Sequence, residues 1–293
     1  MSRRVVLVTG ASGTLGRPVC SALVTRDWTV RALVHRTAVT LADEHVRGSL
    51  EDASSLTRAV EGAHAVLHLA ALTHSRNPRR YDQINRVGTV NLVDAARTAG
   101  ASRFVLASTR AISPEGGAYS RSKNAAETAV AASGLDYTIV RLPEMYGAGG
   151  SEGVDRIIGL ARAGKAIPLV AADTEVICPA HFDDVVPSLV EALENERAVG
   201  KTYTLAGDCL TLRAFAESCV TAFESASSIV DLPLTAVRLV AALGRLLPLP
   251  VYPDQVARLL APKPRISEDA VDHLRFRPRS LEEGLRSLAR PTA

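Results

Sequence analysis

Residues 5–16 read Val-Val-Leu-Val-Thr-Gly-Ala-Ser-Gly-Thr-Leu-Gly. The apolar, β-branched run Val5–Thr9 is typical of a buried strand, and a stretch with helical spacing follows the glycines. Gly10 permits a sharp turn, Gly13 permits close approach of the backbone to a pyrophosphate, and Gly16 lets the helix pack on the sheet. Unpaired N–H groups at the start of that helix favour phosphate. We therefore predict a dinucleotide-binding loop made by Gly10, Ser12, Gly13, Thr14, Leu15 and Gly16.

The end of the next predicted strand, Thr29–Val34, indicates which dinucleotide fits. An acidic residue there would accept hydrogen bonds from a ribose 2′-hydroxyl, but the chain continues with His35 and Arg36. A guanidinium suits a 2′-phosphate instead, and Arg17 can add a second cation. The sequence therefore predicts NADP as the cofactor, with NAD as the less favoured alternative.

Strand-like and helix-like stretches alternate through the first half of the chain. Further strands are expected at Ala65–Leu69, Phe104–Ala107 and Tyr137–Arg141, and helices at Leu15–Thr25, Leu56–Val60, Tyr81–Ala99 and Asn124–Ala132. Continuous apolar strands separated by helices imply a parallel sheet covered on both faces. The predicted fold class is α/β, a Rossmann-type doubly wound parallel sheet.

The periodic pattern weakens after Gly147, which indicates a change of organisation. We expect an NADP-binding domain over residues 1–150 and a smaller, mostly helical substrate domain over residues 151–293, with residues 175–206 returning to the Rossmann sheet. The expected elements of the second half are helices at Val154–Ala163 and Val185–Leu193 and strands at Glu175–Ile177 and Thr202–Leu205.

Composition excludes several classes of protein. The net charge is only +3 in 293 residues and no long basic run occurs, which disfavours a nucleic-acid partner. Residues 230–252 are apolar, but Arg238, Arg245 and several prolines interrupt them, so no bilayer span is expected. No signal-peptide pattern opens the chain, and we predict a cytoplasmic location.

Cysteine and histidine spacing indicates no metal site. No Cys-x-x-Cys pair occurs, and a chain of this length does not need disulfides, so all four cysteines are expected to be free thiols. His68 and His181 are expected to be packed, structural histidines. The four cysteines are Cys20, Cys178, Cys209 and Cys219.

Two further features point to proton transfer. Tyr119 and Lys123 are four residues apart, which places them on one face of a helix. An ammonium beside a phenol lowers the tyrosine pKa and makes the phenol a usable acid or base. The predicted strand Phe104–Ala107 is followed by Ser108 and Thr109. Thr109 therefore lies at the carboxyl end of a parallel strand, on the edge of the sheet where ligands bind. Its hydroxyl can donate a hydrogen bond to a substrate carbonyl oxygen.

Taken together, these motifs resemble the extended short-chain dehydrogenase/reductase family, of the NAD-dependent epimerase/dehydratase type. The likeness also includes His68-Leu-Ala-Ala71, Asn85-Arg-Val-Gly-Thr-Val-Asn-Leu92, Arg141-Leu-Pro-Glu-Met-Tyr-Gly147 and His181-Phe-Asp-Asp184. The resemblance implies that Thr109 polarises the reacting oxygen, that Tyr119 is the general acid/base and that Lys123 holds the nicotinamide ribose. It implies further cofactor contacts at Ser49, Leu50, Leu69, Ala70, Ala71, Asn85, Pro143 and Met145. Ser49 replaces the aspartate usual in the family.

Two departures from the family pattern bear on the substrate. Arg110-Ala111 stands where sugar-nucleotide dehydratases carry Asp-Glu, and residues 176–180 lack the arginine that commonly faces a diphosphate. Both favour a ketoreductase or alcohol dehydrogenase that acts on a hydrophobic ketone or secondary alcohol. The apolar run Leu232–Leu249 suits a steroid-like molecule or another secondary metabolite.

Two alternatives stay open: a nucleotide-sugar epimerase, and a non-catalytic NADP-binding regulatory protein, although the latter usually has a broken Tyr-x-x-x-Lys pair. The sequence leaves open the identity and stereochemistry of the substrate, the direction of the reaction and the oligomeric state. The family often forms homodimers through helices that correspond to residues 85–99 and 124–132.

Overall fold

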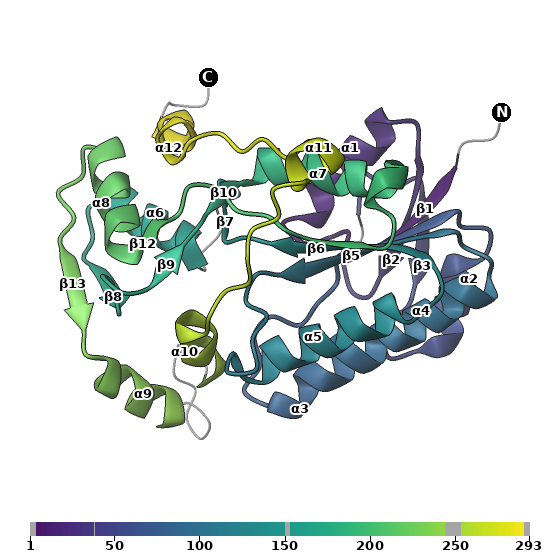
Figure 1. Ribbon diagram of the computed structural model, residues 1–293, viewed down its shortest axis with the longest axis horizontal. Helices are drawn as coiled ribbons and strands as arrows, with labels where there is room; N and C mark the ends of the chain where they lie inside the picture. The colour runs from purple at the N-terminus through teal and green to yellow at the C-terminus, as the bar shows by residue number, and fades with distance from the viewer. Residues whose placement is uncertain (1–3, 38, 150–152, 244–252, 290–293) are drawn as a thin grey trace.

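Seven parallel strands form the centre of the computed structural model, which describes residues 4–37, 39–149, 153–243 and 253–289 (Figure 1). The spatial order of the strands is β11-β6-β5-β4-β1-β2-β3. Their bounds are β1 Val5–Thr9, β2 Thr29–Val34, β3 Glu44–Arg47, β4 Ala65–His68, β5 Arg103–Thr109, β6 Asp136–Leu142 and β11 Lys201–Thr204. The chain winds outward from β1 in both directions, and this order confirms the predicted Rossmann-type fold.

Helices cover both faces of the sheet. One face packs against α1 (Gly16–Thr25), α7 (Phe182–Glu194) and the short α11 (Ala270–His273), and the other against α2 (Ala53–Val60), α4 (Gly88–Thr98) and α5 (Gly117–Ala131) (Figure 1). Successive side chains of β1 point to opposite faces of the sheet. Val6 and Val8 pack in the apolar cluster on one face, and Leu7 packs in the cluster on the other. The carboxyl ends of β1 and β4, where the winding direction changes, face the region that carries the candidate site.

The helix predicted over Tyr81–Ala99 is not a continuous α-helix. It consists of α3 (Pro78–Tyr81), a π-helical segment η1 (Asp82–Val87) and α4. A π-turn inserts one extra residue and rotates the side chains that follow, which periodicity alone does not reveal. Asn85 lies in this segment and is only 2% exposed.

A third apolar cluster lies beyond the sheet, at the left of Figure 1. Its elements are α6 (Gly153–Arg162), β8 (Ile167–Val170), α8 (Leu212–Ala222), β13 (Ile229–Leu232) and α12 (Leu281–Ala289). Short paired strands connect it to the sheet: β7 (Met145–Tyr146) with β10 (Ala180–His181), and β9 (Val176–Ile177) with β12 (Leu210–Thr211). How the chain divides into domains stays a prediction, although β11 does pair with β6.

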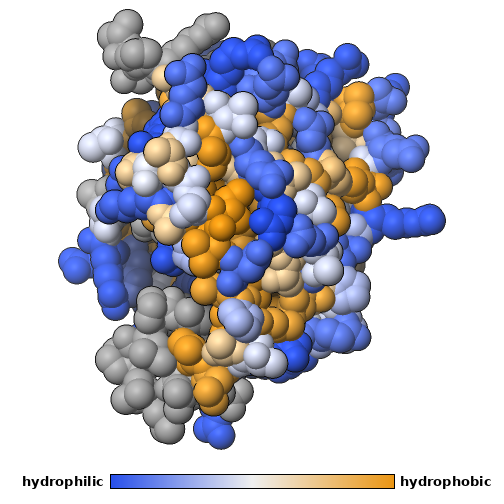
Figure 2. Space-filling view, turned by 90° about the vertical axis from the view of Figure 1, so that its left-hand side faces the viewer, coloured by the Kyte–Doolittle hydropathy of each residue, from blue (hydrophilic) through white to orange (hydrophobic). Residues whose placement is uncertain are grey.

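Two more helices, α9 (Leu234–Leu243) and α10 (Pro253–Leu260), lie next to one another below this cluster in Figure 1, and α10 also packs against α5. Figure 2 shows apolar side chains gathered on the end of the molecule that carries the third cluster. Exposed apolar residues of β13 and α9 include Val230, Leu232 and Leu239. The expected apolar run Leu232–Leu249 is described only to residue 243, and its remainder lies outside the described residues. In the described parts of the chain, no helix has the length and apolar character that crossing a bilayer requires.

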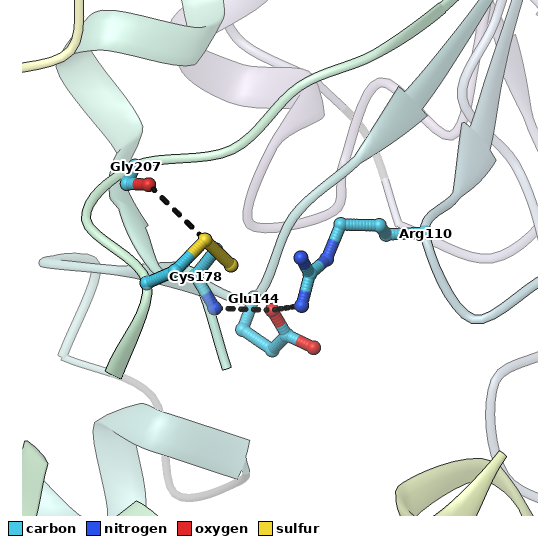
Figure 3. The surroundings of a disulfide bond; sticks show 5 residues. Arg110, Glu144, Cys178 and Gly207 are labelled. Atoms are coloured by element: carbon cyan, nitrogen blue, oxygen red, sulfur yellow. Dashed lines mark hydrogen bonds and ion pairs between the residues drawn. A yellow bond between two sulfur atoms is a disulfide. The ribbon is translucent and has the colours of Figure 1, made fainter. Parts of the chain in front are cut away.

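The cysteine prediction is wrong for two of the four residues. Cys178 and Cys209, which are 31 residues apart, form a disulfide, whereas Cys20 and Cys219 are free and buried. The loop after β9 and the loop after β11 meet beside the candidate site, where Gly207 N donates to the carbonyl of Cys178 (3.1 Å). Figure 3 shows the disulfide with Gly207 beside it. This proximity arises from the tertiary fold and leaves no trace in the sequence spacing.

Candidate active site

The glycine loop after β1 forms a tight cradle. Gly10 has a φ of +71°, and a Cβ there would lie 2.7 Å from the backbone nitrogen of Ala70, so a side chain is excluded. A Cβ at Gly16 would lie 2.1 Å from the carbonyl oxygen of Gly10. Gly13 and Thr14 are exposed at the start of α1. The cradle therefore fits the pyrophosphate of a dinucleotide at a helix N-terminus.

Two arginines stand at the rim of this cradle. Arg36 is exposed just after β2, and Arg17 lies in the first turn of α1, where its Nε donates to the carbonyl of Ser12 (3.2 Å). Both positions suit an adenosine ribose that carries a 2′-phosphate. The preference for NADP stays a prediction.

The loop expected on the adenine side is fixed by its neighbours. Ser49 N donates to the hydroxyl of Ser55 (3.2 Å), and the amide of Asn91 donates to the carbonyl of Leu50 (3.2 Å). Leu50 packs against Gly88, where a Cβ would approach to 2.7 Å. Asp52 caps α2 by accepting from two backbone N–H groups. This loop therefore has a defined shape at the carboxyl end of β3.

His68 holds the adjacent strand ends together. Its ring is 2.6 Å from the Thr9 hydroxyl and 3.0 Å from the Thr89 hydroxyl, and Ala70 N donates to the same Thr9 hydroxyl (3.2 Å). Burial lowers the pKa of His68 to about 3, and the charge of Lys123 contributes to the shift. A neutral ring that joins two hydroxyls fixes the position of the residues that follow β4, including Leu69 and Ala71.

Tyr119 and Lys123 lie on one face of α5 and point back toward the end of β5. Tyr119 is 7% exposed and Lys123 is 3% exposed, and Lys123 Nζ donates to the carbonyl of Ala107 (2.8 Å). Burial lowers the pKa of Lys123 to about 8, against the opposing effect of Glu127. The phenol of Tyr119 lies close to the Thr109 hydroxyl, and both residues line one cavity. The structure thus brings together all three predicted catalytic residues.

The pKa of Tyr119 is raised rather than lowered. Burial is the largest cause, the charge of Arg258 and the hydrogen bond from Thr109 oppose it, and Asp254 adds to it. This differs from the expectation that a neighbouring lysine lowers the tyrosine pKa, because desolvation of the phenolate outweighs the cations.

Asn85 connects the segment after β4 to α5. Its side-chain amide donates to the carbonyl of Leu72 (3.0 Å) and to the hydroxyl of Ser122 (3.1 Å), and its oxygen accepts from Leu72 N (2.8 Å). Ser122 in turn donates to the carbonyl of Tyr119 (2.8 Å). The structure supports a positioning role for Asn85, while direct contact with a cofactor stays a prediction.

Sequence analysis missed two residues of α10 that contact Tyr119. Arg258 lies over the ring of Tyr119, 4.4 Å from its centre. Asp254 accepts from Tyr119 N (3.2 Å) and lies 3.6 Å from the Arg258 guanidinium. Neither residue belongs to a local motif, so only the folded chain reveals the contact.

A cavity of about 700 Å³ opens between the sheet and the third cluster. Thr109, Tyr119, Pro143 and Met145 line one part of it. Most other walls are apolar and include Val154, Ile157, Leu160, Leu169, Val170, Ile177, Leu212, Leu232, Val237, Val256 and Leu259. The glycine loop, Arg36 and the adenine-side residues lie along the sheet edge and are not among the described residues that line this cavity. The arrangement fits a cofactor along the sheet and a substrate in the cavity. No three His, Cys, Asp or Glu side chains in the described ranges are grouped as a metal ion would require.

Comparison with known proteins agrees with this geometry. The family model for the NAD-dependent epimerase/dehydratase family matches residues 6–206. The ceramide reductase of Caulobacter vibrioides is 34% identical over 194 residues, which cover 64% of this chain and 61% of the relative. The match therefore spans less than two thirds of that relative's length. The 2-alkyl-3-oxoalkanoate reductase of Stenotrophomonas maltophilia is 28% identical, with 98% of this chain and 99% of the relative covered.

Solved structures share the fold. The UDP-glucose 4-epimerase of Thermotoga maritima superposes with a TM-score of 0.77 at 21% identity, over 96% of both chains. This likeness concerns the architecture, whereas the family model covers the strands and helices that carry the glycine loop, Thr109, Tyr119 and Lys123. The chain therefore belongs to the NAD-dependent epimerase/dehydratase family, within the extended short-chain dehydrogenases/reductases, and is an NAD(P)-dependent enzyme.

Proposed function

We propose that this enzyme is an NADP(H)-dependent ketoreductase or alcohol dehydrogenase for a hydrophobic ketone or secondary alcohol. One observation carries the proposal: the hydroxyl-bearing side chains of Thr109 and Tyr119 line one side of a cavity whose other walls are mostly apolar. The names of the two relatives, ceramide reductase and 2-alkyl-3-oxoalkanoate reductase, support reduction as the chemistry.

In this proposal Thr109 and Tyr119 act on the carbonyl oxygen of the substrate. A bound NADPH supplies a hydride to the carbonyl carbon. Thr109 donates a hydrogen bond to the carbonyl oxygen, and Tyr119 transfers its phenolic proton to that oxygen as negative charge develops there. The raised pKa of Tyr119, caused mainly by burial, keeps the phenol protonated near neutral pH, which suits an acid in the direction of reduction.

Lys123 and Arg258 support this proton transfer. The ammonium of Lys123 donates to the carbonyl of Ala107, and it would contact the nicotinamide ribose when the cofactor is bound. Arg258 lies over the Tyr119 ring and stabilises the phenolate left after proton transfer. The glycine loop with Gly10, together with Arg36, would hold the pyrophosphate and the 2′-phosphate.

The alternatives are less well supported. Sugar-nucleotide enzymes commonly carry an arginine against the diphosphate in the segment before His181, and residues 176–180 of this chain lack one, while the cavity walls are mostly apolar. A non-catalytic NADP-binding protein has no need for the buried, connected set of Thr109, Tyr119 and Lys123.

A cytoplasmic location and a homodimer through α4 and α5 stay predictions.

A substrate screen that follows NADPH absorbance tests the proposal. We expect hydrophobic ketones to consume NADPH stoichiometrically, and the matched variant Tyr119→Phe to abolish this consumption. Epimerisation of UDP- or dTDP-sugars with substoichiometric NADP would favour the epimerase instead. Tight binding of NADPH without turnover of any ketone, alcohol or sugar nucleotide would favour the regulatory protein.

A further inference from the structure

A buried carboxylate that the proposed mechanism does not use lies one helical turn beyond Lys123. Glu127 belongs to α5 and is only 6% exposed. Residues four apart share one face of a helix, so its carboxylate and the ammonium of Lys123 lie on the same side of α5. Glu127 is not among the described residues that line the substrate cavity. Any effect of this carboxylate on the reaction must therefore pass through a neighbouring side chain.

Arg141 and Ser108 hold the carboxylate of Glu127 in place. Arg141 Nε donates to both carboxylate oxygens (3.1 Å each), and its Nη2 donates to Oε2 (2.7 Å). The hydroxyl of Ser108 donates to Oε1 (2.5 Å). Ser108 and Arg141 are themselves register partners on the neighbouring strands β5 and β6. Because a guanidinium binds a carboxylate in a defined geometry, the negative charge has a fixed position between α5 and these strands.

Lys123 and Glu127 contact successive residues of β5. Lys123 Nζ donates to the carbonyl of Ala107 (2.8 Å), and Glu127 accepts from the next residue, Ser108. Thr109 follows directly and ends the strand. The two contacts thus fix the end of β5 that carries Thr109 against the face of α5 that carries the lysine.

Glu127 also acts on the charge of Lys123. Burial lowers the pKa of Lys123 to about 8, and the carboxylate of Glu127 opposes this effect. Without the carboxylate, desolvation of the ammonium would remove its proton at a lower pH. A neutral Lys123 would offer no positive charge beside the phenol of Tyr119 or at the ribose.

The other titratable groups close to this part of α5 come from four elements and from α5 itself. The ionic residues of η1 and α4 pair with one another at exposed positions. The nearby cations are also paired, because Arg141 binds Glu127 and Arg258 binds Asp254. The histidine of β4 has its own pKa lowered to about 3 and is therefore neutral. The groups are His68 of β4, Tyr81 of α3, Tyr119 of α5, Arg141 of β6, and Asp254 and Arg258 of α10.

We propose that Glu127 is a positioning residue that acts through Lys123: its fixed carboxylate keeps the lysine side chain positively charged at the place where the nicotinamide ribose would bind. The ion pair with Arg141 then has a role beyond holding α5 on the sheet. The inference rests on the proposed function only for the ribose contact of Lys123, and it concerns the cofactor side of the site.

Titration of Lys123 tests the inference without cofactor or substrate. The chain contains four lysines, so NMR of protein that carries isotope-labelled lysine can follow each of them, and Lys123→Arg identifies the signal of interest. Glu127→Gln keeps the size of the side chain and removes its charge. We expect it to lower the titration midpoint of Lys123 by about one pH unit or more, the usual effect of losing a nearby opposite charge. An unchanged midpoint would overturn the inference.

Two further variants separate the charge of Glu127 from its packing. Ser108→Ala removes a hydrogen bond to the carboxylate but keeps the charge, so the midpoint of Lys123 should stay close to that of the unmodified protein. Glu127→Gln leaves Arg141 as an unpaired buried cation, which would itself lower the midpoint and destabilise the fold. The double variant Glu127→Gln/Arg141→Met removes both charges, and we still expect a lowered midpoint. A midpoint equal to that of the unmodified protein would contradict the proposal.

NADPH binding measures the consequence for the cofactor. Fluorescence titrations compare Glu127→Gln with the unmodified protein at about pH 6 and about pH 8, which lie on either side of the expected midpoint of the variant. We expect equal affinities at the lower pH, where Lys123 is charged in both proteins, and severalfold weaker binding by the variant at the higher pH. The titration of the cofactor's own phosphate is common to both proteins. A loss of affinity by the same factor at both pH values would mean a purely structural role and would refute the inference.

These measurements separate the inference from the proposed function, because neither needs a substrate. A lowered Lys123 midpoint and pH-dependent loss of NADPH affinity in Glu127→Gln, without reduction of any ketone, would support the role of Glu127 and refute the ketoreductase. Reduction of ketones by a protein whose Lys123 midpoint does not respond to Glu127→Gln would do the reverse.

Discussion

The guanidinium of Arg258 lies 4.4 Å from the centre of the Tyr119 ring. This contact joins Tyr119, the proposed general acid, to α10, a helix that sequence analysis did not connect with it. The positive charge opposes the effect of burial on the pKa of Tyr119, because it favours the phenolate.

Arg258→Met should therefore slow the proton-transfer step. A cation–π contact is worth about 0.5–2 kcal/mol, so we expect kcat to fall by roughly three- to thirtyfold, with little change in NADPH affinity. The kcat of Arg258→Lys should lie between the kcat of Arg258→Met and that of the unmodified enzyme. Steady-state kinetics and NADPH titration measure both effects, and an unchanged kcat in Arg258→Met would remove Arg258 from the mechanism.

Tyr119→Phe keeps the ring and removes the transferable proton. Positioned acid catalysis contributes about 10²–10⁴-fold, so we expect kcat to fall by at least about two orders of magnitude while NADPH still binds. Lys123→Ala should weaken both turnover and cofactor binding, and Thr109→Ala should lower kcat alone. If Tyr119→Phe retained more than about a tenth of the activity, another group would have to supply the proton.

Cofactor preference depends on Arg36. We expect NADPH to bind more tightly than NADH, and Arg36→Asp to erase or reverse the preference. A charge-assisted contact to phosphate is worth about 1.5–3 kcal/mol, roughly ten- to a hundredfold in affinity. Fluorescence titration of both cofactors gives the ratio, and Arg17→Ala is the matched control for the second cation. Equal affinities in the unmodified protein would falsify the NADP assignment.

Stability should fall at mildly acid pH because of His68. Its pKa is lowered to about 3, mainly by burial, so the unfolded chain binds a proton near the ordinary pKa while the folded chain does not. The folded protein therefore has its full free energy of unfolding above about pH 6.5. Part of that free energy is lost as the pH falls toward 3, because only the unfolded chain binds the proton. Between pH 7 and pH 5 we expect this residue to remove about 2 kcal/mol from the free energy of unfolding.

Urea unfolding at several pH values measures this loss. His68→Gln, which can still hydrogen-bond to the hydroxyls of Thr9 and Thr89, should be less stable at neutral pH but should have a flatter acid dependence. Identical pH slopes for the two proteins would show that His68 is not responsible.

The Cys178–Cys209 disulfide should contribute to stability. It closes a loop across 31 residues, and cross-links of this kind typically add about 2–4 kcal/mol. Cys209→Ser should therefore lower the thermal unfolding midpoint by several degrees, and a reducing agent should do the same to the unmodified protein. The reducing agent should leave the unfolding midpoint of Cys209→Ser unchanged. A change of midpoint in that variant would mean that the reducing agent acts through Cys20 or Cys219 instead of the disulfide.

Local patterns predicted much of the fold and site. The glycine loop, the strand over Thr29–Val34 and the shared helical face of Tyr119 and Lys123 follow from short-range spacing, and the structure contains all three. The edge strand β3, Glu44–Arg47, was missed because its four residues include only one apolar side chain, Val46, and so lack the apolar run of a buried strand.

Features that depend on long-range contacts could not be predicted. The π-helical segment around Asn85 changes the backbone without changing the apolar pattern. The disulfide, and the contact of Arg258 with Tyr119, join loops and helices that are distant in sequence. The direction of the Tyr119 pKa depends on burial, which spacing does not report.

The bond from Tyr119 N to Asp254 spans 135 residues and has a consequence for engineering. The family model ends at residue 206, so Asp254 and Arg258 belong to the part of the chain that it does not cover. A chimera that joins residues up to 206 of this protein to the C-terminal part of a relative would exchange the apolar walls of β13 and α9 and the charges beside the phenol at the same time. Substrate selectivity and the acid strength of Tyr119 would then change together. Neither property could be moved into another protein without the other.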